Sequence, residues 1–168
     1  MALVTFQNLP NTSTPLNAEN LNANFEKNVI TVQASDMNIT DTTDSQNNTI
    51  IFNGTVSSLG NKLSLNTTTG EVTIGSGISY VKVSCGCEII LGSSGMTYHA
   101  VSIRKNGSQV GKWAQTKGNY NPNVYGYATL SNVLIPVSEG DKITVAVFNR
   151  LAGSYIIGSP YMTVEVVA

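Results

Sequence analysis

The chain has 168 residues, a length typical of a single domain. Charged residues make up only 11% of it and the net charge is −1, so the sequence offers no basic patch for nucleic acid. Its apolar runs are too short to cross a membrane, and its first residues lack the basic and apolar regions of a secretory signal. We therefore expect a polar, weakly charged protein with neither a nucleic-acid nor a membrane partner.

Residues 1–28 are predicted to form a leader with a short helix. The segment is rich in Asn, and Thr14 precedes Pro15, a residue that suits the first position of a helix. A heptad stripe over about two heptads follows, made of Ala18, Leu21, Phe25 and Val32. Such a stripe is marginal alone but can associate in an oligomer. The alternative is a solvated leader in which this spacing is accidental.

Residues 29–48 are predicted to be a linker or stalk. Isolated apolar residues alternate with Thr, Asp and Asn, and the stretch Thr40–Asn48 has no apolar residue. Asp36, Asp41 and Asp44 are candidate calcium ligands, but their spacing does not follow the rule of a calcium-binding loop. We therefore favour a solvated acidic linker and predict no metal site.

Residues 49–168 alternate between apolar and polar side chains almost throughout, the pattern of half-buried strands. Turn signals separate the strands, among them Asn106-Gly107 at the tip of a hairpin and the stretch Pro136–Ile143. About eight strands with one polar face each predict an all-β fold, a two-sheet antiparallel sandwich or jelly roll. The predicted inward residues include Val81, Val83, Cys85, Cys87, Ile89 and Leu91, then Ile143, Val145 and Val147, and finally Met162, Val164 and Val166.

The sequence contains few groups capable of catalysis. His99 is the single histidine and lies in the inward register of its strand, which is typical of a hydrogen-bonded core or interface residue. Cys85 and Cys87 lie on the apolar face of theirs, where a free cysteine behaves as a small hydrophobe. Neither a paired acid nor a phosphate-binding glycine loop is evident. We predict no enzyme, no catalytic residue and no cofactor.

One stretch has the composition of a recognition loop. Gln115–Tyr127 combines Tyr with Asn and Gly, and a tryptophan lies just upstream. Rigid aromatic rings supply contact area and small polar groups supply hydrogen bonds, so such a loop suits stacking on sugars. The alternative is a hairpin loop with tyrosines that pack at a subunit interface. The predicted binding residues are Trp113, Tyr120, Asn121, Asn123, Tyr125 and Tyr127.

The order of strands and turns resembles the trimeric jelly-roll head shared by complement-type globular heads and the tumour necrosis factor superfamily. The resemblance covers about two thirds of the chain, and the stretches that match best are Asn66–Ser84, Val101–Val110, Ser131–Val147 and Tyr161–Val167. Two departures are the small number of Phe residues, four in all, and the ending VEVVA in place of aromatic residues. The resemblance implies a homotrimer.

The leader resembles a second group of proteins. STPLNAENLN (Ser13–Asn22) is similar to the TPLNAxNLN leader that begins many tail, baseplate and fibre proteins of bacteriophages infecting Gram-positive bacteria. In those proteins the leader lies at the virion-attachment end. The resemblance implies a virion-attachment role for Leu9, Pro10, Pro15, Leu16, Asn17, Leu21 and Phe25.

Together these features predict a structural virion protein: a trimeric phage fibre or spike, located on the virion surface after synthesis in the host cytoplasm. Its N-terminus would bind capsid, collar, tail or baseplate proteins, and its head would bind a host-surface glycan. One alternative is a capsid head fibre or decoration protein without receptor binding. Others are a polysaccharide-degrading enzyme domain and a secreted or spore-surface protein with the same head.

Overall fold

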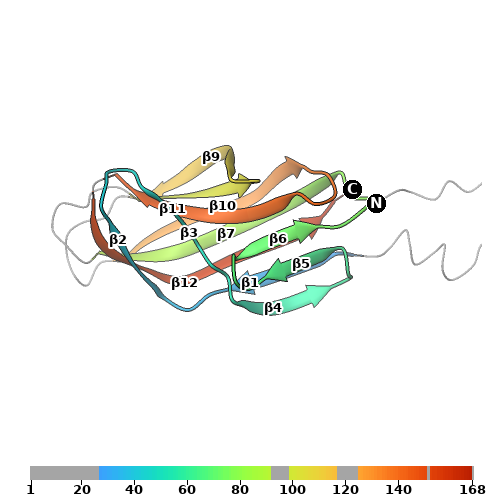
Figure 1. Ribbon diagram of the computed structural model, residues 1–168, viewed down its shortest axis with the longest axis horizontal. Coiled ribbons are helices and arrows are strands. Elements are labelled where there is room, and N and C mark those ends of the chain that lie inside the picture. Colours follow the sequence, from blue (N-terminus) through green and yellow to red (C-terminus); the bar gives the residue numbers. More distant parts are fainter. Residues whose placement is uncertain (1–26, 92–98, 117–124, 151, 168) are drawn as a thin grey trace, which may run out of the picture.

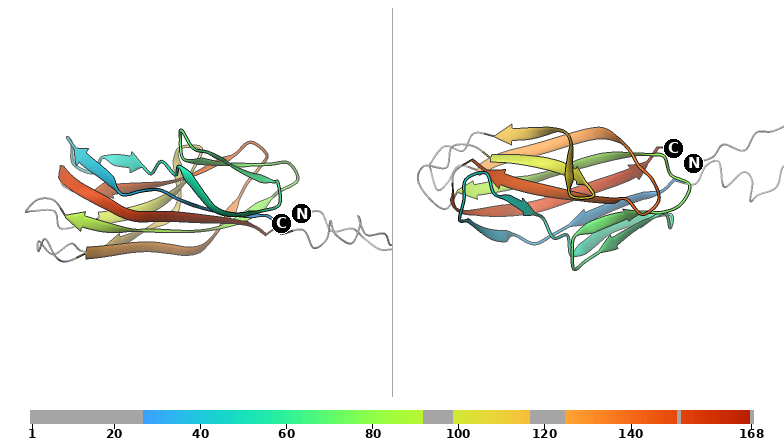
Figure 2. Two further views of the ribbon diagram at one scale, coloured as in Figure 1. Left: turned by 90° about the horizontal axis from the view of Figure 1, so that it is seen from below. Right: turned by 45° about the horizontal axis from the view of Figure 1, so that its top comes forward.

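The computed structural model of the chain describes residues 27–91, 99–116, 125–150 and 152–167. These residues form two antiparallel sheets that pack face to face around one core (Figures 1 and 2). The predicted all-β, two-sheet fold is confirmed. The leader helix and every predicted attachment residue precede residue 27 and lie outside the described residues.

The first sheet has the strand order β10-β7-β12-β1-β4, with β2 paired to β12. Its strands are β1 (Val29–Gln33), β2 (Met37–Asp41), β4 (Gly54–Leu59), β7 (Tyr80–Leu91), β10 (Tyr125–Pro136) and β12 (Gly153–Val166). The second sheet has the order β5-β6-β11-β8-β9, with β3 paired to β11. Its strands are β3 (Asn47–Thr49), β5 (Leu63–Asn66), β6 (Glu71–Ile74), β8 (His99–Lys105), β9 (Ser108–Thr116) and β11 (Lys142–Asn149).

The core lies between the sheets and is built by the predicted alternation. Successive side chains of a strand point to opposite faces, so each strand contributes every second residue to the core. The predicted inward residues of β7, β11 and β12 are buried as expected, except that Val166 is half-buried and the side chain of Leu91 lies outside the description. Large residues from the intervening loops complete the core, chiefly Ile50, Phe52 and Ile78.

Residues 29–48 differ from the predicted linker. They contain β1, β2 and β3, and β1 lies inside the first sheet between β12 and β4. The apolar residues that looked isolated in sequence, such as Ile30 and Val32, are the inward residues of β1 and are buried against the core. Because Val32 belongs to a strand, it is not part of a helical stripe that continues from the leader.

The three aspartates considered as calcium ligands serve three separate structural roles. Asp36 Oδ1 accepts the backbone N–H of Ser159 at 2.9 Å, and Asp44 Oδ1 accepts the backbone N–H of Ala152 at 2.8 Å. Asp41 is buried and accepts a hydrogen bond from Asn48 Nδ2 at 2.7 Å. Asp36 and Asp44 are exposed to solvent, as expected, but they do not belong to a linker, because they hold the bulge and the start of β12, and Asp41 is buried.

The predicted hairpin and turn are both present. Asn106 and Gly107 connect β8 to β9 with φ values of 52° and 79°, the left-handed pair that a two-residue hairpin turn requires. Asn106 Oδ1 accepts the backbone N–H of Lys142 at 2.9 Å, and its Nδ2 donates to Asp141 Oδ1 at 2.7 Å. The hairpin tip is thereby fastened to the turn between β10 and β11.

The sandwich has two different ends. β1 begins and β12 ends at the same end, where Val29 is the register partner of Glu165 (Figure 1). We call this the proximal end. β7 and β9 finish, and β8 and β10 begin, at the opposite or distal end (Figure 1). Residues 92–98 and 117–124 therefore connect strand ends that lie at the distal end.

Candidate functional site

Two of the predicted binding residues have described side chains, and they face in different directions. Trp113 on β9 is 44% exposed, and Tyr127 on β10 is 68% exposed. Their neighbours Ala114 and Ala128 pack against the core, so Trp113 faces outward from the second sheet and Tyr127 outward from the first. The structure thus separates these two residues. The side chain of Tyr125 and all of Tyr120, Asn121 and Asn123 lie outside the description.

The position of Trp113 depends on the strand beside it. Its ring meets the Phe148 ring edge-on, with centroids 5.7 Å apart and planes at 87°. β8 runs between the strands of the two residues, which are therefore about 9.6 Å apart at twice the usual strand spacing. The rings must lean together above β8. The outward residues of β8 at this place, Ala100 and Ser102, are small and fully buried, which leaves room for the rings.

A depression of about 450 Å³ lies beside the indole of Trp113 and is called the Trp113 groove here. It is lined by Gln109, Gly111, Lys112, Trp113 and Gln115. The groove combines a flat aromatic surface with two amides and one ammonium group. The C–H face of a sugar ring can stack on such a surface while its hydroxyls bind the polar groups at the rim.

The outer face of the first sheet carries a second exposed feature. Large side chains point outward from it, and we call four of them the first-sheet face: Tyr80, Tyr127, Leu134 and Tyr161. The Tyr127 hydroxyl donates to Glu88 Oε1 at 3.1 Å. A Cβ at Gly86 would lie 3.0 Å from Tyr161 Cε1, so glycine at this position leaves space for the tyrosine ring.

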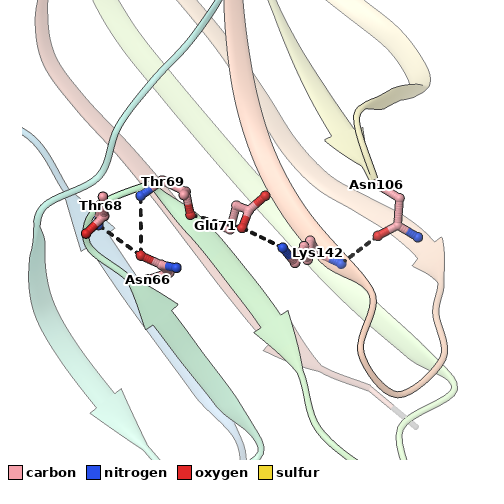
Figure 3. Close-up of polar contacts among 6 residues, drawn as sticks. All are labelled: Asn66, Thr68, Thr69, Glu71, Asn106 and Lys142. Carbon is pink, nitrogen blue, oxygen red and sulfur yellow. Dashed lines mark hydrogen bonds and ion pairs between the residues drawn. The ribbon is translucent and has the colours of Figure 1, made fainter.

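A row of polar contacts crosses the outer face of the second sheet (Figure 3). Glu71 Oε2 accepts hydrogen bonds from Lys142 Nζ and from Thr69 Oγ1, each at 2.9 Å. These contacts, the one from Lys142 foremost, lower the pKa of the Glu71 carboxyl. At one end of the row Asn66 Oδ1 accepts the backbone N–H of Thr69 at 3.3 Å. At the other end Asn106 holds the backbone of Lys142.

Sequence reasoning missed this polar row and the adjacent Arg104. Alternation alone places Lys142 and Arg104 on the outward face, because Ile143 and Ile103 beside them are buried. The alternation can therefore be read from the sequence. The cross-strand neighbours of these residues cannot, since they depend on the register between β6, β11 and β8.

The candidate nucleophiles and base are buried in the core. Cys85 and Cys87 are free, and burial raises the pKa of each thiol to about 12. His99 is fully buried with its ring centroid 5.7 Å from that of Tyr155, and burial lowers its pKa to about 4. The predicted burial is confirmed. The predicted hydrogen bond of His99 is not, because neither ring nitrogen has a partner in the described part of the chain.

Within residues 27–91, 99–116, 125–150 and 152–167, no three His, Cys, Asp or Glu side chains come together as metal ligands would. The same residues include no helix with the length and apolar character needed to span a membrane.

Comparison with known proteins identifies the fold. The chain matches no protein-family model and no curated protein. Its fold is similar to that of murine APRIL, with a TM-score of 0.54 and 14% identity over 84% of this chain and 99% of that one. The globular domain of zebrafish complement 1qA is similar with a TM-score of 0.54 and 10% identity, over 84% of this chain and 98% of that one. Eiger TNF from S. frugiperda is similar with a TM-score of 0.55 and 11% identity, over 84% of this chain and 92% of that one. The described residues thus share the jelly-roll fold of these proteins.

Proposed function

We propose that this chain is the subunit of a homotrimeric bacteriophage fibre or spike. In this proposal the leader fastens the trimer to a virion protein of the capsid, collar, tail or baseplate, and the head binds a glycan on the host surface. The similarity of Ser13–Asn22 to phage-appendage leaders supports the phage assignment. The fold supports a binding head.

One observation of the structure carries the proposal, namely that the head has two different ends. The chain enters β1 at the proximal end, directly after the leader segment (Figure 1). A head fastened through its leader would therefore present its distal end to the outside. The segment 117–124, which contains three of the six predicted binding residues, joins strands at that distal end.

The first-sheet face supports the homotrimer. An exposed group of large apolar side chains in a polar, weakly charged protein is typical of an interaction surface. Leu134 is 57% exposed and Tyr127 68% exposed in the single chain. Closed three-fold assembly would bury this face in each subunit and leave both ends of the sandwich accessible.

The Trp113 groove supports glycan binding. Each single groove would bind a sugar weakly, since it offers one aromatic ring and a few polar groups. A trimer presents three grooves to a repeating polymer. After the first site binds, the second and third bind at high effective concentration, so weak contacts become useful adhesion.

Deletion of residues 1–28 tests the attachment step. The truncated protein should remain a soluble trimer and should be absent from purified particles, whereas the full chain is incorporated. Normal decoration of virions by the truncated protein would contradict the anchor assignment. Because Lys27 and Asn28 precede β1, a second truncation that removes only residues 1–26 controls for damage to the head.

Replacement of Tyr120 and Tyr125 by alanine tests the adhesion step separately. Adsorption of the trimer to host cells should weaken while the thermal unfolding temperature is unchanged. Unaltered adsorption would remove these tyrosines from the binding surface and favour a decoration protein without a receptor.

A further inference from the structure

The outer face of the second sheet contains a larger depression than the Trp113 groove. Its volume is about 530 Å³, within the range of small-molecule sites. Residues from β3, β6, β8, β11 and the loops next to them line it, including Ile51, Thr69, Glu71, Arg104, Lys142 and Thr144. We call it the Arg104 pocket.

The pocket is lined by more positively charged than negatively charged side chains. Glu71 is its single carboxylate, and Lys142 Nζ already binds it at 2.9 Å. Thr69 occupies the same carboxylate oxygen, Oε2, at 2.9 Å. Arg104 is therefore a second cation for which the pocket supplies no counter-ion. The pocket carries a net positive charge on a protein with an overall charge of −1.

Arg104 is held in place, but not all of its hydrogen-bond donors have an acceptor. Its Nη1 donates to the carbonyl oxygen of Gly107 at 2.9 Å, which fixes the guanidinium against the hairpin tip. Its Nε is buried and has no acceptor within the described part of the chain. A buried donor without a partner is costly, and a guanidinium offers a planar fork that matches carboxylate and phosphate oxygens. An anionic group in the pocket would satisfy it.

The remaining lining suits a polyhydroxylated molecule. The pocket is bordered by the hydroxyls of Thr49, Thr69 and Thr144, groups that both donate and accept hydrogen bonds. Ile51 lies among them and is 44% exposed, so it offers an apolar contact for a C–H face. A small apolar surface with a few polar groups around it is the usual composition of a ligand site.

We infer that the Arg104 pocket binds an acidic saccharide unit, with its carboxylate or phosphate on Arg104 and its hydroxyls on the threonines. The inference rests on the proposed glycan-binding function and specifies the ligand as negatively charged. Arg104 is the cross-strand partner of Gln109, which lines the Trp113 groove. The two depressions are therefore neighbours, and one polymer could occupy both.

Calorimetric titration of the full chain tests the inference with three probes. They are a disaccharide containing glucuronic acid, a short glycerol phosphate oligomer and a neutral disaccharide of similar size. We expect saturable binding of at least one acidic probe that weakens as salt is raised. The neutral probe should bind at least tenfold more weakly. Preference between the acidic probes identifies carboxylate or phosphate as the natural group.

Variants of Arg104 locate the binding. Arg104→Gln should weaken binding of the acidic probe about tenfold to a hundredfold, as expected for a lost charged hydrogen bond. Arg104→Lys keeps the charge without the planar fork, so its affinity for the acidic probe should lie between those of wild type and Arg104→Gln. This variant provides the test if Arg104→Gln does not fold. Lys82→Gln is the matched control, because Lys82 is a half-buried cation on the first sheet, 4.0 Å from Glu165. It should bind like wild type.

Several results would overturn the inference. They are equal binding of neutral and acidic probes, no saturable binding of either acidic probe, and unchanged affinity in both Arg104 variants. Adsorption to host cells distinguishes this failure from failure of the proposed function. Host adsorption that needs Trp113 but not Arg104 rejects the pocket and keeps the adhesion function. Acidic-probe binding through Arg104 without any host adsorption keeps the pocket and rejects the adhesion function.

Discussion

Trp113 and Phe148 meet edge-on at 5.7 Å across a strand to which neither belongs. The contact exists because Ala100 and Ser102, on the intervening β8, are too small to separate the rings. The indole is thereby supported on one edge while nearly half of its surface stays exposed. A supported and exposed ring is well suited to stack on a ligand, since little side-chain freedom is lost on binding.

Replacement of Trp113 by alanine should weaken adsorption to host cells by removing the stacking surface of the groove. The aromatic pair with Phe148 is lost as well, so the free energy of unfolding should fall by about 1 kcal/mol. Trp113→Phe retains a ring and should keep most of the adsorption. Adsorption and chemical denaturation of both variants check this. Full adsorption by the alanine variant would exclude the Trp113 groove as a receptor site.

Replacement of Leu134 by aspartate should break the proposed trimer. The side chain is largely exposed in the single chain, so the charge should scarcely change the folding of a subunit, but it would be buried unpaired in an interface. Light scattering should give about 53 kDa for wild type, three times 17.8 kDa, and the single-chain mass for the variant. Ile51→Asp, an exposed position in the loop between β3 and β4, is the control and should remain trimeric. A trimeric Leu134→Asp variant would place the interface elsewhere.

The burial of His99 predicts a loss of stability in mild acid. The folded state holds the imidazole neutral with a pKa of about 4, whereas the unfolded chain has the ordinary value near 6.5. As the pH falls, the unfolded state therefore binds a proton at a higher pH than the folded state does. The stability that depends on neutral His99 is fully present above pH 6.5, and the free energy of unfolding falls by about 3 kcal/mol as the pH drops to 4.

Urea denaturation at pH 7 and pH 4.5, for wild type and His99→Gln, isolates this effect from that of the carboxylates. The variant should lose less stability between the two values, because glutamine does not titrate. Equal pH dependence in the two proteins would mean that His99 is not held neutral in the folded state.

The two cysteines should be unreactive in the folded protein. Their thiols are buried with pKa values raised to about 12, so the reactive thiolate is scarce at pH 8. A thiol reagent should detect almost none of them in native protein and two per chain in guanidinium chloride. Rapid reaction of either thiol under native conditions would reopen the question of a cysteine nucleophile.

The strands that could be predicted from sequence are those with sustained alternation. β7 and β11 each place several apolar residues in strict alternation, and the hairpin tip Asn106-Gly107 dictates its own turn. β1 could not be recognised, because five residues are too few for a clear period. Its burial comes from β12, more than 120 residues away in sequence, with pairs such as Val32 and Met162.

The candidate site was predictable only in part. Trp113 was identified by residue type, but its contact with Phe148 depends on the strand order β11-β8-β9, which single-sequence patterns do not reveal. Tyr127 was assigned to the same surface, yet the chain passes from the second sheet to the first between β9 and β10. The Arg104 pocket combines four strands with loop residues such as Ile51 and Thr69, so it follows from the packing of the second sheet.

Imaging of intact phage particles at subnanometre resolution, with and without a label fused after Ala168, tests the central claim most directly. The account predicts three-fold heads on the particle surface, each with its proximal end toward the virion. Because β12 ends at the proximal end, the label should appear between head and virion. Particles that lack the protein, or heads attached by their distal ends with the label outermost, would contradict it.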